Sequence, residues 1–228
     1  MSTPRPPGEI LLIDKPLGWT SFQAVKKIKY TLKARRVGHA GTLDPLATGL
    51  LIVCTEGSTR KIEEIQAAEK EYTGIITLGS STPSFDLETE PDEHKPWEFV
   101  TPELIEQTLP AFRGEIMQAP PLYSAIKVSG KRAYEIARSG QSHEMKLRPT
   151  HIYRFDIEKI AGNELHFRVV CSKGTYIRSL AHDFAKALGT LGHLSKLVRT
   201  RIGDYRLENA ISPLLVQAGN PGTENNVL

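Results

Sequence analysis

Apolar and polar residues follow two different periods along this chain, and each change of period marks an expected helix or strand. A spacing of three to four residues predicts helices that start after Thr20 or Ser21, over 58–67, from Thr101 and over 177–188. Strand patterns occupy 9–13, 50–54, 71–78, 164–171 and 197–207. The run at 50–54 is apolar throughout, which is typical of a strand buried on both faces.

The order of these elements indicates the fold class. Helices and strands alternate irregularly, without a sustained strand–helix–strand rhythm, which predicts an α+β fold with a mixed, mostly antiparallel sheet flanked by helices. We expect one domain over 8–207, followed at 208–228 by a short C-terminal helix and a tail. The chain contains neither a GxGxxG nor a GxxxxGKS motif, so no nucleotide cofactor is indicated.

The charge distribution adds two features to this picture. The 228 residues carry 29 basic and 26 acidic side chains, but the stretch 84–98 holds six of the acids and one lysine, so the remainder has a net charge of +8. We expect 84–98 to be a solvated acidic loop. Segment 113–151 reads as a basic insert with a short helix over 132–139. Charge alone does not separate a polyanion-binding role for this insert from a solvated surface hairpin.

Several classes of protein are disfavoured by the residues that are missing. The two cysteines, Cys54 and Cys171, lack CxxC spacing and lie in apolar runs, as expected of buried thiols in a reducing compartment. The histidines form no metal-binding motif, so we expect no metal. No apolar run is long enough to cross a membrane, and the N-terminal residues lack the apolar core of a secretory signal, so a cytoplasmic protein is expected.

A solitary carboxylate is the most informative chemical feature. Asp44 is the only charged residue, histidine aside, between Arg36 and Glu56. Pro45 disfavours helical geometry at Asp44, while Gly41 and Gly49 allow tight turns or the close approach of another group. A turn aspartate would be the ordinary explanation of an Asp-Pro pair. The apolar surroundings instead favour a carboxylate with a chemical role.

Four further segments decide between these explanations. They are KPLGWTS at 15–21, KEY at 70–72, QAPPLYSAIK at 118–127 and CSKGTYIRSL at 171–180. Together with GTLDP at 41–45, they resemble the TruB-type tRNA pseudouridine synthases, in the order of that family and over nearly the whole chain. The GTLDP loop is highly specific, and GTYIR supports it strongly.

The resemblance implies a fold, an activity and a partner. It implies the pseudouridine synthase fold with a basic, RNA-gripping insert, and an enzyme that isomerises uridine 55 in the T loop of tRNA to pseudouridine without a cofactor. The target nucleotide has to be flipped out of the loop to reach the enzyme. The expected partner is the T-arm stem-loop of tRNA, bound by a monomer. Many bacterial members carry an extra C-terminal RNA-binding domain of the PUA type, for which the residues after Tyr205 are too few.

The resemblance also assigns roles to individual residues. It implies that Asp44 is the catalytic aspartate, that Arg178 pairs with it, and that Tyr72 stacks on the target base. A guanidinium would hold the carboxylate ionised and oriented. The implied substrate-binding residues are Lys15, His39, Tyr176, Leu197 and, in the basic insert, Lys131 and Arg132.

Two other functions stay open at this level. A non-catalytic tRNA-binding or tRNA-folding factor could use the same scaffold without needing Asp44. A nucleoside hydrolase would also place a carboxylate near C1′, but it would normally show paired acids or a metal-binding acid cluster, and neither is obvious here.

Overall fold

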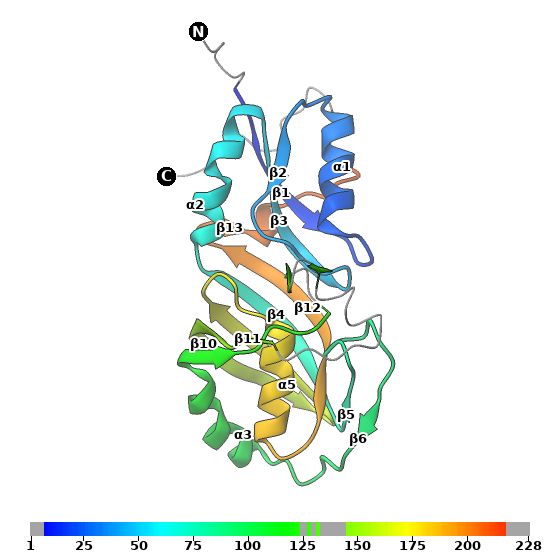
Figure 1. The fold of residues 1–228 in the computed structure, drawn as a ribbon, viewed down its shortest axis with the longest axis vertical. Coiled ribbons are helices and arrows are strands. Elements are labelled where there is room, and N and C mark those ends of the chain that lie inside the picture. The colour runs from blue at the N-terminus through cyan, green and yellow to red at the C-terminus, as the bar shows by residue number, and fades with distance from the viewer. Residues whose placement is uncertain (1–6, 124–126, 129–130, 133–144, 218–228) are drawn as a thin grey trace. The chain divides into compact units, whose positions relative to one another are not determined.

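The computed structural model describes residues 7–123, 127–128, 131–132 and 145–217, and the chain divides into two compact units (Figure 1). The first unit combines 1–72 with 198–228, and the second comprises 73–197. Two strands, β4 (Lys70–Leu78) and β12 (Gly192–Ile202), have residues in both units.

The first unit is built on a short antiparallel sheet. Strand β3 (Ala47–Thr55) pairs antiparallel with β1 (Ile10–Lys15) and with β2 (Val37–His39). The end of β12 lies next to β3 and forms a hairpin with β13 (Tyr205–Arg206), which is followed by the 3₁₀ helix η3 (Leu207–Asn209).

Two helices cover opposite faces of this sheet. Helix α1 (Ser21–Thr31) begins at the capping box of Thr20 and packs on Leu51 and Val53. The 3₁₀ helix η1 (Glu56–Lys61) leads into α2 (Ile62–Ala67), which packs on Leu50 and Ile52. Alternate residues of β3 therefore meet different helices, which confirms the predicted strand buried on both faces.

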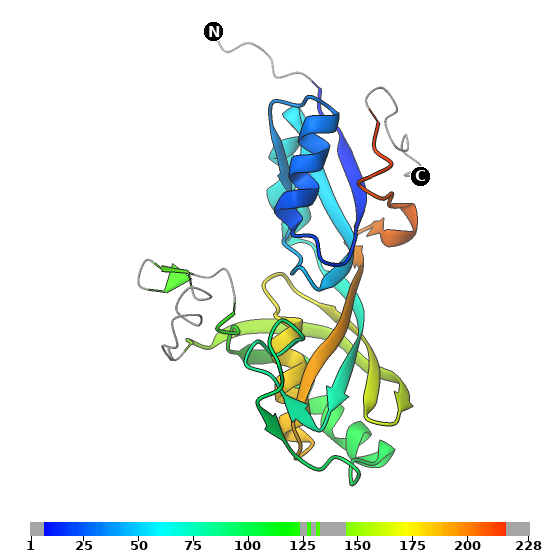
Figure 2. The same ribbon diagram turned by 90° about the vertical axis from the view of Figure 1, so that its right-hand side faces the viewer.

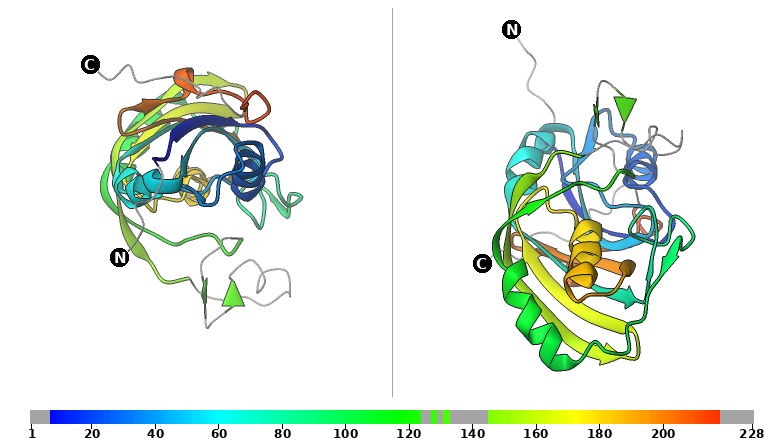
Figure 3. Two further views of the ribbon diagram at one scale, coloured as in Figure 1. Left: turned by 90° about the horizontal axis from the view of Figure 1, so that it is seen from above. Right: turned by 60° about the horizontal axis from the view of Figure 1, so that its bottom comes forward.

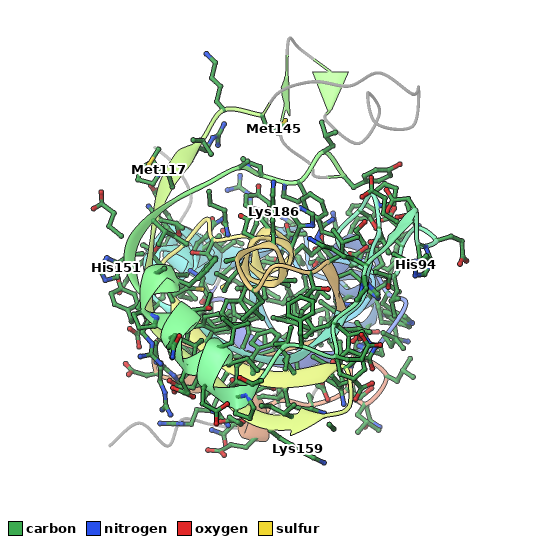
Figure 4. The ribbon with its side chains drawn as sticks, turned by 90° about the horizontal axis from the view of Figure 1, so that it is seen from below. His94, Met117, Met145, His151, Lys159 and Lys186 are labelled. Carbon is green, nitrogen blue, oxygen red and sulfur yellow. The ribbon has the colours of Figure 1, made fainter. Side chains whose placement is uncertain are left out.

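The second unit contains the part of the nine-stranded sheet of the described residues that has the strand order β12-β4-β11-β10-β7. Its members β7 (Gly114–Gln118), β10 (Arg148–Ala161) and β11 (Glu164–Cys171) pair antiparallel. Helix α5 (Ile177–Ala187) lies against the inner face of this sheet (Figures 1 and 3), where Phe184 meets the Phe155 ring edge-on at a centroid distance of 5.0 Å. Figure 4 looks along α5 and shows Lys159 on the outer side of β10.

Smaller elements complete the second unit. Helix α3 (Pro102–Thr108) begins at Thr101, as predicted, and continues into the 3₁₀ helix η2 (Leu109–Phe112). Two further antiparallel pairs join β5 (Ser80–Ser81) with β6 (Glu93–His94), and β8 (Lys127–Val128) with β9 (Lys131–Arg132). No described helix is long and apolar enough to cross a membrane.

The structure modifies two expectations about charged segments. Both ends of the basic insert lie in strands of the sheet. Strand β7 pairs antiparallel with the start of β10, where Gln118 is opposite Arg148 and Gly114 is opposite Ile152. The predicted helix of the insert over 132–139 lies almost wholly outside the described residues. The expectation that 84–98 is a solvated loop is wrong at its first residues, since Ser84 and Asp86 are buried.

Candidate active site

The loop that carries Asp44 is held in one shape by its neighbours in the first unit. Leu43 N–H donates to Ser21 Oγ at 2.8 Å, and Ser21 Oγ donates to the Leu43 carbonyl at 3.0 Å. A turn bond from Ala47 N–H to the Asp44 carbonyl (3.1 Å) then leads into β3. Asp44 itself is half-buried, so its carboxylate sits at the margin between protein and solvent.

Glycine is required at two positions of this loop, as its sequence predicted. Gly41 and Gly49 both have φ near +97°, a region that residues with side chains rarely adopt. A Cβ atom on Gly49 would lie 2.4 Å from the Arg199 carbonyl oxygen, so β3 and β12 can approach each other only with glycine there.

Lys15 lies beside the Asp44 loop and ties it to the segment before α1. Its fully buried ammonium group donates to the carbonyls of Trp19 (2.6 Å), Pro16 (3.0 Å) and Pro45 (3.4 Å). Burial lowers the pKa of Lys15 to about 8, and the negative charge of Asp44 opposes that shift. Lys15 is thus a structural clamp on the residue that follows Asp44.

Arg199 is a second buried cation at this loop, and the sequence analysis missed it. Its Nε donates to the Leu50 carbonyl at 2.8 Å, and its terminal nitrogens donate to Gly41 (3.1 Å) and Thr42 (3.4 Å). Only 1% of Arg199 is exposed. Because one guanidinium spans three carbonyls, it fixes the loop to β3. The sequence did contain a clue to Arg199, because the alternation of residues along β12 places this cation at a buried position.

His39 ends β2 close to the same loop. Burial lowers the pKa of its imidazole and so favours the neutral ring. A hydrogen bond with the Gly41 backbone opposes this shift, and the positive charge of Arg199 adds to it. His39 Nδ1 is buried without a hydrogen-bond partner among the described residues.

Tyr72 is the third residue of β4 and the last residue of the first unit in this part of the chain. Only 8% of it is exposed. This degree of burial suits either core packing or stacking on a base.

In the second unit, Arg178 is the second residue of α5 and is 4% exposed, which excludes the alternative of an ordinary surface arginine. Its Nε lies 3.6 Å from Asp86 Oδ2, and its Nη1 donates to the Ser84 carbonyl at 3.2 Å. The sequence analysis missed Asp86 because it lies in an acidic stretch. The sequence feature that could have identified Asp86 is that its neighbours Ser84, Phe85 and Leu87 are uncharged.

The turn around Asp86 has a strained backbone that is held by packing. Phe85 adopts a φ of +62°, which is unfavourable for a bulky residue. Its ring stacks on His182 of α5 at a centroid distance of 4.0 Å. Thr82 Oγ1 and Ser84 Oγ both donate to the Asp86 carbonyl. These contacts direct both the Ser84 carbonyl and the Asp86 carboxylate at Arg178.

The start of α5 is also clamped by the segment that leads into the basic insert. The Gln118 side chain accepts from Tyr176 N–H at 2.8 Å and donates to the Tyr176 carbonyl at 3.0 Å. Ser179 Oγ donates to the Ala119 carbonyl at 2.7 Å. Tyr176 is therefore fixed at the N-terminus of α5, half-buried. Leu197, on β12, is almost fully buried.

The predicted site residues thus fall into two groups. Lys15, His39 and Asp44 come together with Arg199 in the first unit, whereas Tyr176 and Arg178 lie at the start of α5 in the second. Asp44 and Arg178 belong to different units, so their pairing stays a prediction. For Lys131 and Arg132 the structure gives their backbone pairing with β8. No group of three or more His, Cys, Asp or Glu among the described residues could hold a metal ion.

Comparisons with known proteins identify the family of this chain. A family model described as TruB family pseudouridylate synthase (N terminal domain) matches residues 29–177. The "tRNA pseudouridine synthase B" of Flavobacterium johnsoniae is 55% identical over 217 residues, covering 92% of this chain and 95% of that protein. The protein of the same name from Phocaeicola vulgatus is 51% identical over 211 residues, covering 90% of each chain.

Solved structures extend the agreement to the fold. A chain in the "Crystal Structure of a Cbf5-Nop10-Gar1 Complex" is 34% identical, with a TM-score of 0.69 over 89% of this chain. A chain in the "Structure of H/ACA RNP bound to a substrate RNA containing 2'-deoxyuridine" is 31% identical, with a TM-score of 0.66. The present chain spans about half the length of each, 51% and 50%. By family model, by relatives and by fold, this chain belongs to the TruB family of pseudouridylate synthases.

Proposed function

We propose that this chain isomerises uridine 55 in the T loop of tRNA to pseudouridine, with Asp44 as the catalytic carboxylate. The names of its relatives support a tRNA substrate. The observation that carries the proposal is the setting of Asp44, a half-buried carboxylate in a rigid loop beside Lys15 and Arg199.

The chemistry requires an anion at this place. The bond between N1 of uracil and C1′ breaks, and a bond between C5 and C1′ forms, while C5 loses a proton and N1 gains one, so the product is an isomer. Breaking the first bond builds positive character on the sugar, which a carboxylate can stabilise or trap. The neighbouring cation Lys15 interacts with the negative charge of Asp44, which is the form that this role needs.

In the proposal, the second group of residues completes the site. Arg178 pairs with Asp44 and orients it, and Asp86 in turn holds Arg178 through the ion pair described above. Tyr72 stacks on the flipped uracil and acts as a base in the isomerisation. Tyr176 and Leu197 line the uracil pocket.

The remaining residues act on the RNA around the target. His39 contacts the flipped nucleotides with its neutral ring, and Lys15 holds the active-site loop. Lys131 and Arg132 contact the phosphate backbone and help to offset the cost of extruding the nucleotide, which is a few kcal/mol. The enzyme acts as a monomer in the cytoplasm and requires no cofactor or metal.

The test is direct. The protein is incubated with an unmodified T-arm stem-loop, and pseudouridine is mapped at single-nucleotide resolution, with the isosteric Asp44→Asn variant as the control. We expect pseudouridine at position 55 with the wild type and none with the variant. Modification at another nucleotide would overturn the assigned position. RNA binding with no modification by the wild type would instead support a folding factor without catalysis.

A further inference from the structure

One face of α1 combines features that the proposed activity leaves unexplained. This α1 outer face consists of Phe22, Lys26, Lys29 and Tyr30, together with Lys33 just beyond the helix end. In an α-helix, positions four, seven and eight residues apart share one side, so the four helical residues form a single stripe, and Lys33 follows it in the turn after the helix. The opposite side of α1 packs into the core through Ala24 and Ile28. Figure 2 shows α1 on the outside of the first unit.

The aromatic residues of this stripe are unusually exposed. Phe22 is 71% exposed and Tyr30 is 69% exposed, although both lie in a well-formed helix. Lys26 Nζ lies 5.9 Å from the centre of the Tyr30 ring, so the cation and the ring already form one surface. The aliphatic part of Lys26 could cover the Tyr30 ring, which would account in part for a tyrosine at this exposed position. The Phe22 ring remains exposed to solvent.

The sequence segment around this stripe carries charge of a single sign, although the Glu56 carboxylate accepts hydrogen bonds from the Arg35 and Arg36 N–H groups just beyond Lys33. Residues 16–43 contain six lysines and arginines and no aspartate or glutamate. Within the described part of the chain, none of the three lysines on the α1 outer face takes part in an ion pair. A solvated helix face normally mixes both signs, whereas a cationic face interleaved with aromatic rings is typical of surfaces that bind single-stranded nucleic acid.

The stripe starts at the catalytic loop. Ser21, the first residue of α1, exchanges two hydrogen bonds with Leu43, the residue before Asp44. Phe22 therefore directly follows Ser21, whose side chain is hydrogen-bonded to the Asp44 loop. From there the helix runs on for 11 residues, or about 16 Å. An RNA strand that delivers a nucleotide to Asp44 can continue along this face.

We infer that the α1 outer face is a second RNA-binding surface, which holds the strand flanking the target uridine. The lysines bind the phosphate backbone, while Phe22 and Tyr30 stack on unpaired bases or pack on sugars. This inference rests on the proposed function for the identity of the RNA. It differs from the role of Lys131 and Arg132, because those residues belong to the other unit.

The experiment compares two sets of variants by how strongly their RNA affinity depends on salt concentration. The triple variant Lys26→Gln, Lys29→Gln, Lys33→Gln removes charge, whereas Phe22→Ala with Tyr30→Ala removes the rings. Each lost phosphate contact should lower the slope of log Kd against log salt by about 0.7 to 1, so the triple variant should lose about two to three. The aromatic variant should bind about tenfold more weakly with an unchanged slope.

A matched control separates this effect from net charge. Lys95, Lys159 and Lys186 are exposed lysines elsewhere on the protein, and replacing all three with glutamine removes the same charge. We expect that control to bind RNA like the wild type. An equal loss of slope in the control, or an unchanged slope in the α1 triple variant, would overturn the inference. Circular dichroism confirms that each variant is folded.

Kinetics keep this inference distinct from the proposed function. The α1 variants should raise Kd while their single-turnover rate at saturating RNA stays within about twofold of the wild type. The Asp44→Asn variant should do the opposite, binding RNA normally without forming pseudouridine. Loss of a concentration-dependent dimer in the aromatic variant, with RNA binding unchanged, would assign the face to self-association and reject RNA as its occupant.

Discussion

Arg178 Nε lies 3.6 Å from Asp86 Oδ2, and both side chains are almost completely shielded from solvent, at 5% and 7% exposure. A buried guanidinium loses its hydration, so an opposite charge and a carbonyl acceptor must replace it. Asp86 and the Ser84 carbonyl supply both. In the proposed mechanism Arg178 holds Asp44 in place, and Asp86 therefore acts on the chemistry through Arg178.

Asp86→Asn should separate catalysis from RNA binding. The amide keeps the shape of the side chain but removes the charge, so Arg178 loses its fixed orientation. We expect the single-turnover rate to fall by about 100-fold, with Kd for tRNA nearly unchanged. Asp92→Asn is the control, because Asp92 lies in the same segment but is exposed. Equal rates for the two variants would contradict the positioning role.

Arg199→Lys should disturb the Asp44 loop without removing a positive charge. A single ammonium group cannot span the three carbonyls that the guanidinium spans, so the loop loses part of its fixed shape. We expect turnover to fall by about 100-fold in a folded protein. Arg201→Lys, two residues along the same strand, should have little effect. Activity of Arg199→Lys at the level of this control would show that the loop does not depend on the guanidinium.

Tyr72→Phe should separate stacking from proton transfer. The phenyl ring preserves stacking, so the variant should bind RNA like the wild type. If the hydroxyl acts as a base, its removal should slow turnover by about 100-fold or more. The measurements are Kd and the single-turnover rate, with Tyr205→Phe in the same unit as the control. Full activity of Tyr72→Phe would limit Tyr72 to stacking or packing.

Replacing Lys131 and Arg132 together with glutamine should weaken tRNA binding and reduce its salt dependence. Each lost phosphate contact lowers the salt slope by about one, so a reduction of about two is expected. Binding is measured by titration at several salt concentrations, with a Lys95→Gln, Lys159→Gln variant as the charge-matched control. An unchanged slope would remove the basic insert from the RNA interface.

Lys15 should give the folding stability a dependence on alkaline pH. Its pKa is about 8 in the folded protein, against 10.5 for a free side chain. Between these values the unfolded chain binds more protons than the folded one. The free energy of unfolding should therefore rise with pH across this window, by up to about 1.4 kcal/mol per pH unit from this group.

Urea unfolding of the wild type and of Lys15→Met across this window measures that contribution. We expect the variant to lack the rise. Burial raises the pKa of Cys54 to about 11, and its titration lowers stability above its ordinary value of 9.0, but it acts in both proteins and cancels in their difference. A constant difference between the two proteins would mean that Lys15 does not titrate in this range.

Elements with a clean pattern were predictable from the sequence. Helix α1 begins at the capping box of Thr20, and β11 alternates half-buried and buried residues over 164–169, as expected, before its last residues are all buried. Strand β10 escaped prediction although it is the longest described, at 14 residues. Its register shifts between Ile152 and Arg154 and again between Ile157 and Lys159, and each irregularity breaks the alternation on which recognition depends.

The candidate site was predictable where chemistry is concentrated in short motifs. Asp44, Tyr72 and Arg178 stand in such motifs, and the burial of Arg178 agrees with a role beyond the surface. Asp86 and Arg199 were missed for one physical reason. Their importance comes from the groups that they contact. Asp86 pairs with Arg178, which lies 92 positions later in the chain. Arg199 binds the carbonyls of residues 41 and 42, which lie more than 150 positions earlier.

The first unit draws its chain from both ends of the sequence, and this has a consequence for synthesis. Ile211 N–H bonds to the Leu12 carbonyl at 3.0 Å, and Asp14 N–H bonds to the Ile211 carbonyl at 2.9 Å. On the ribosome, the contiguous second unit is complete before these partners emerge. A nascent chain that stops before Arg199 lacks the guanidinium that holds the Asp44 loop, so in the proposed mechanism we expect it to be inactive. If Asp44 has its proposed role, catalytic competence is thereby deferred until Arg199 has been synthesised.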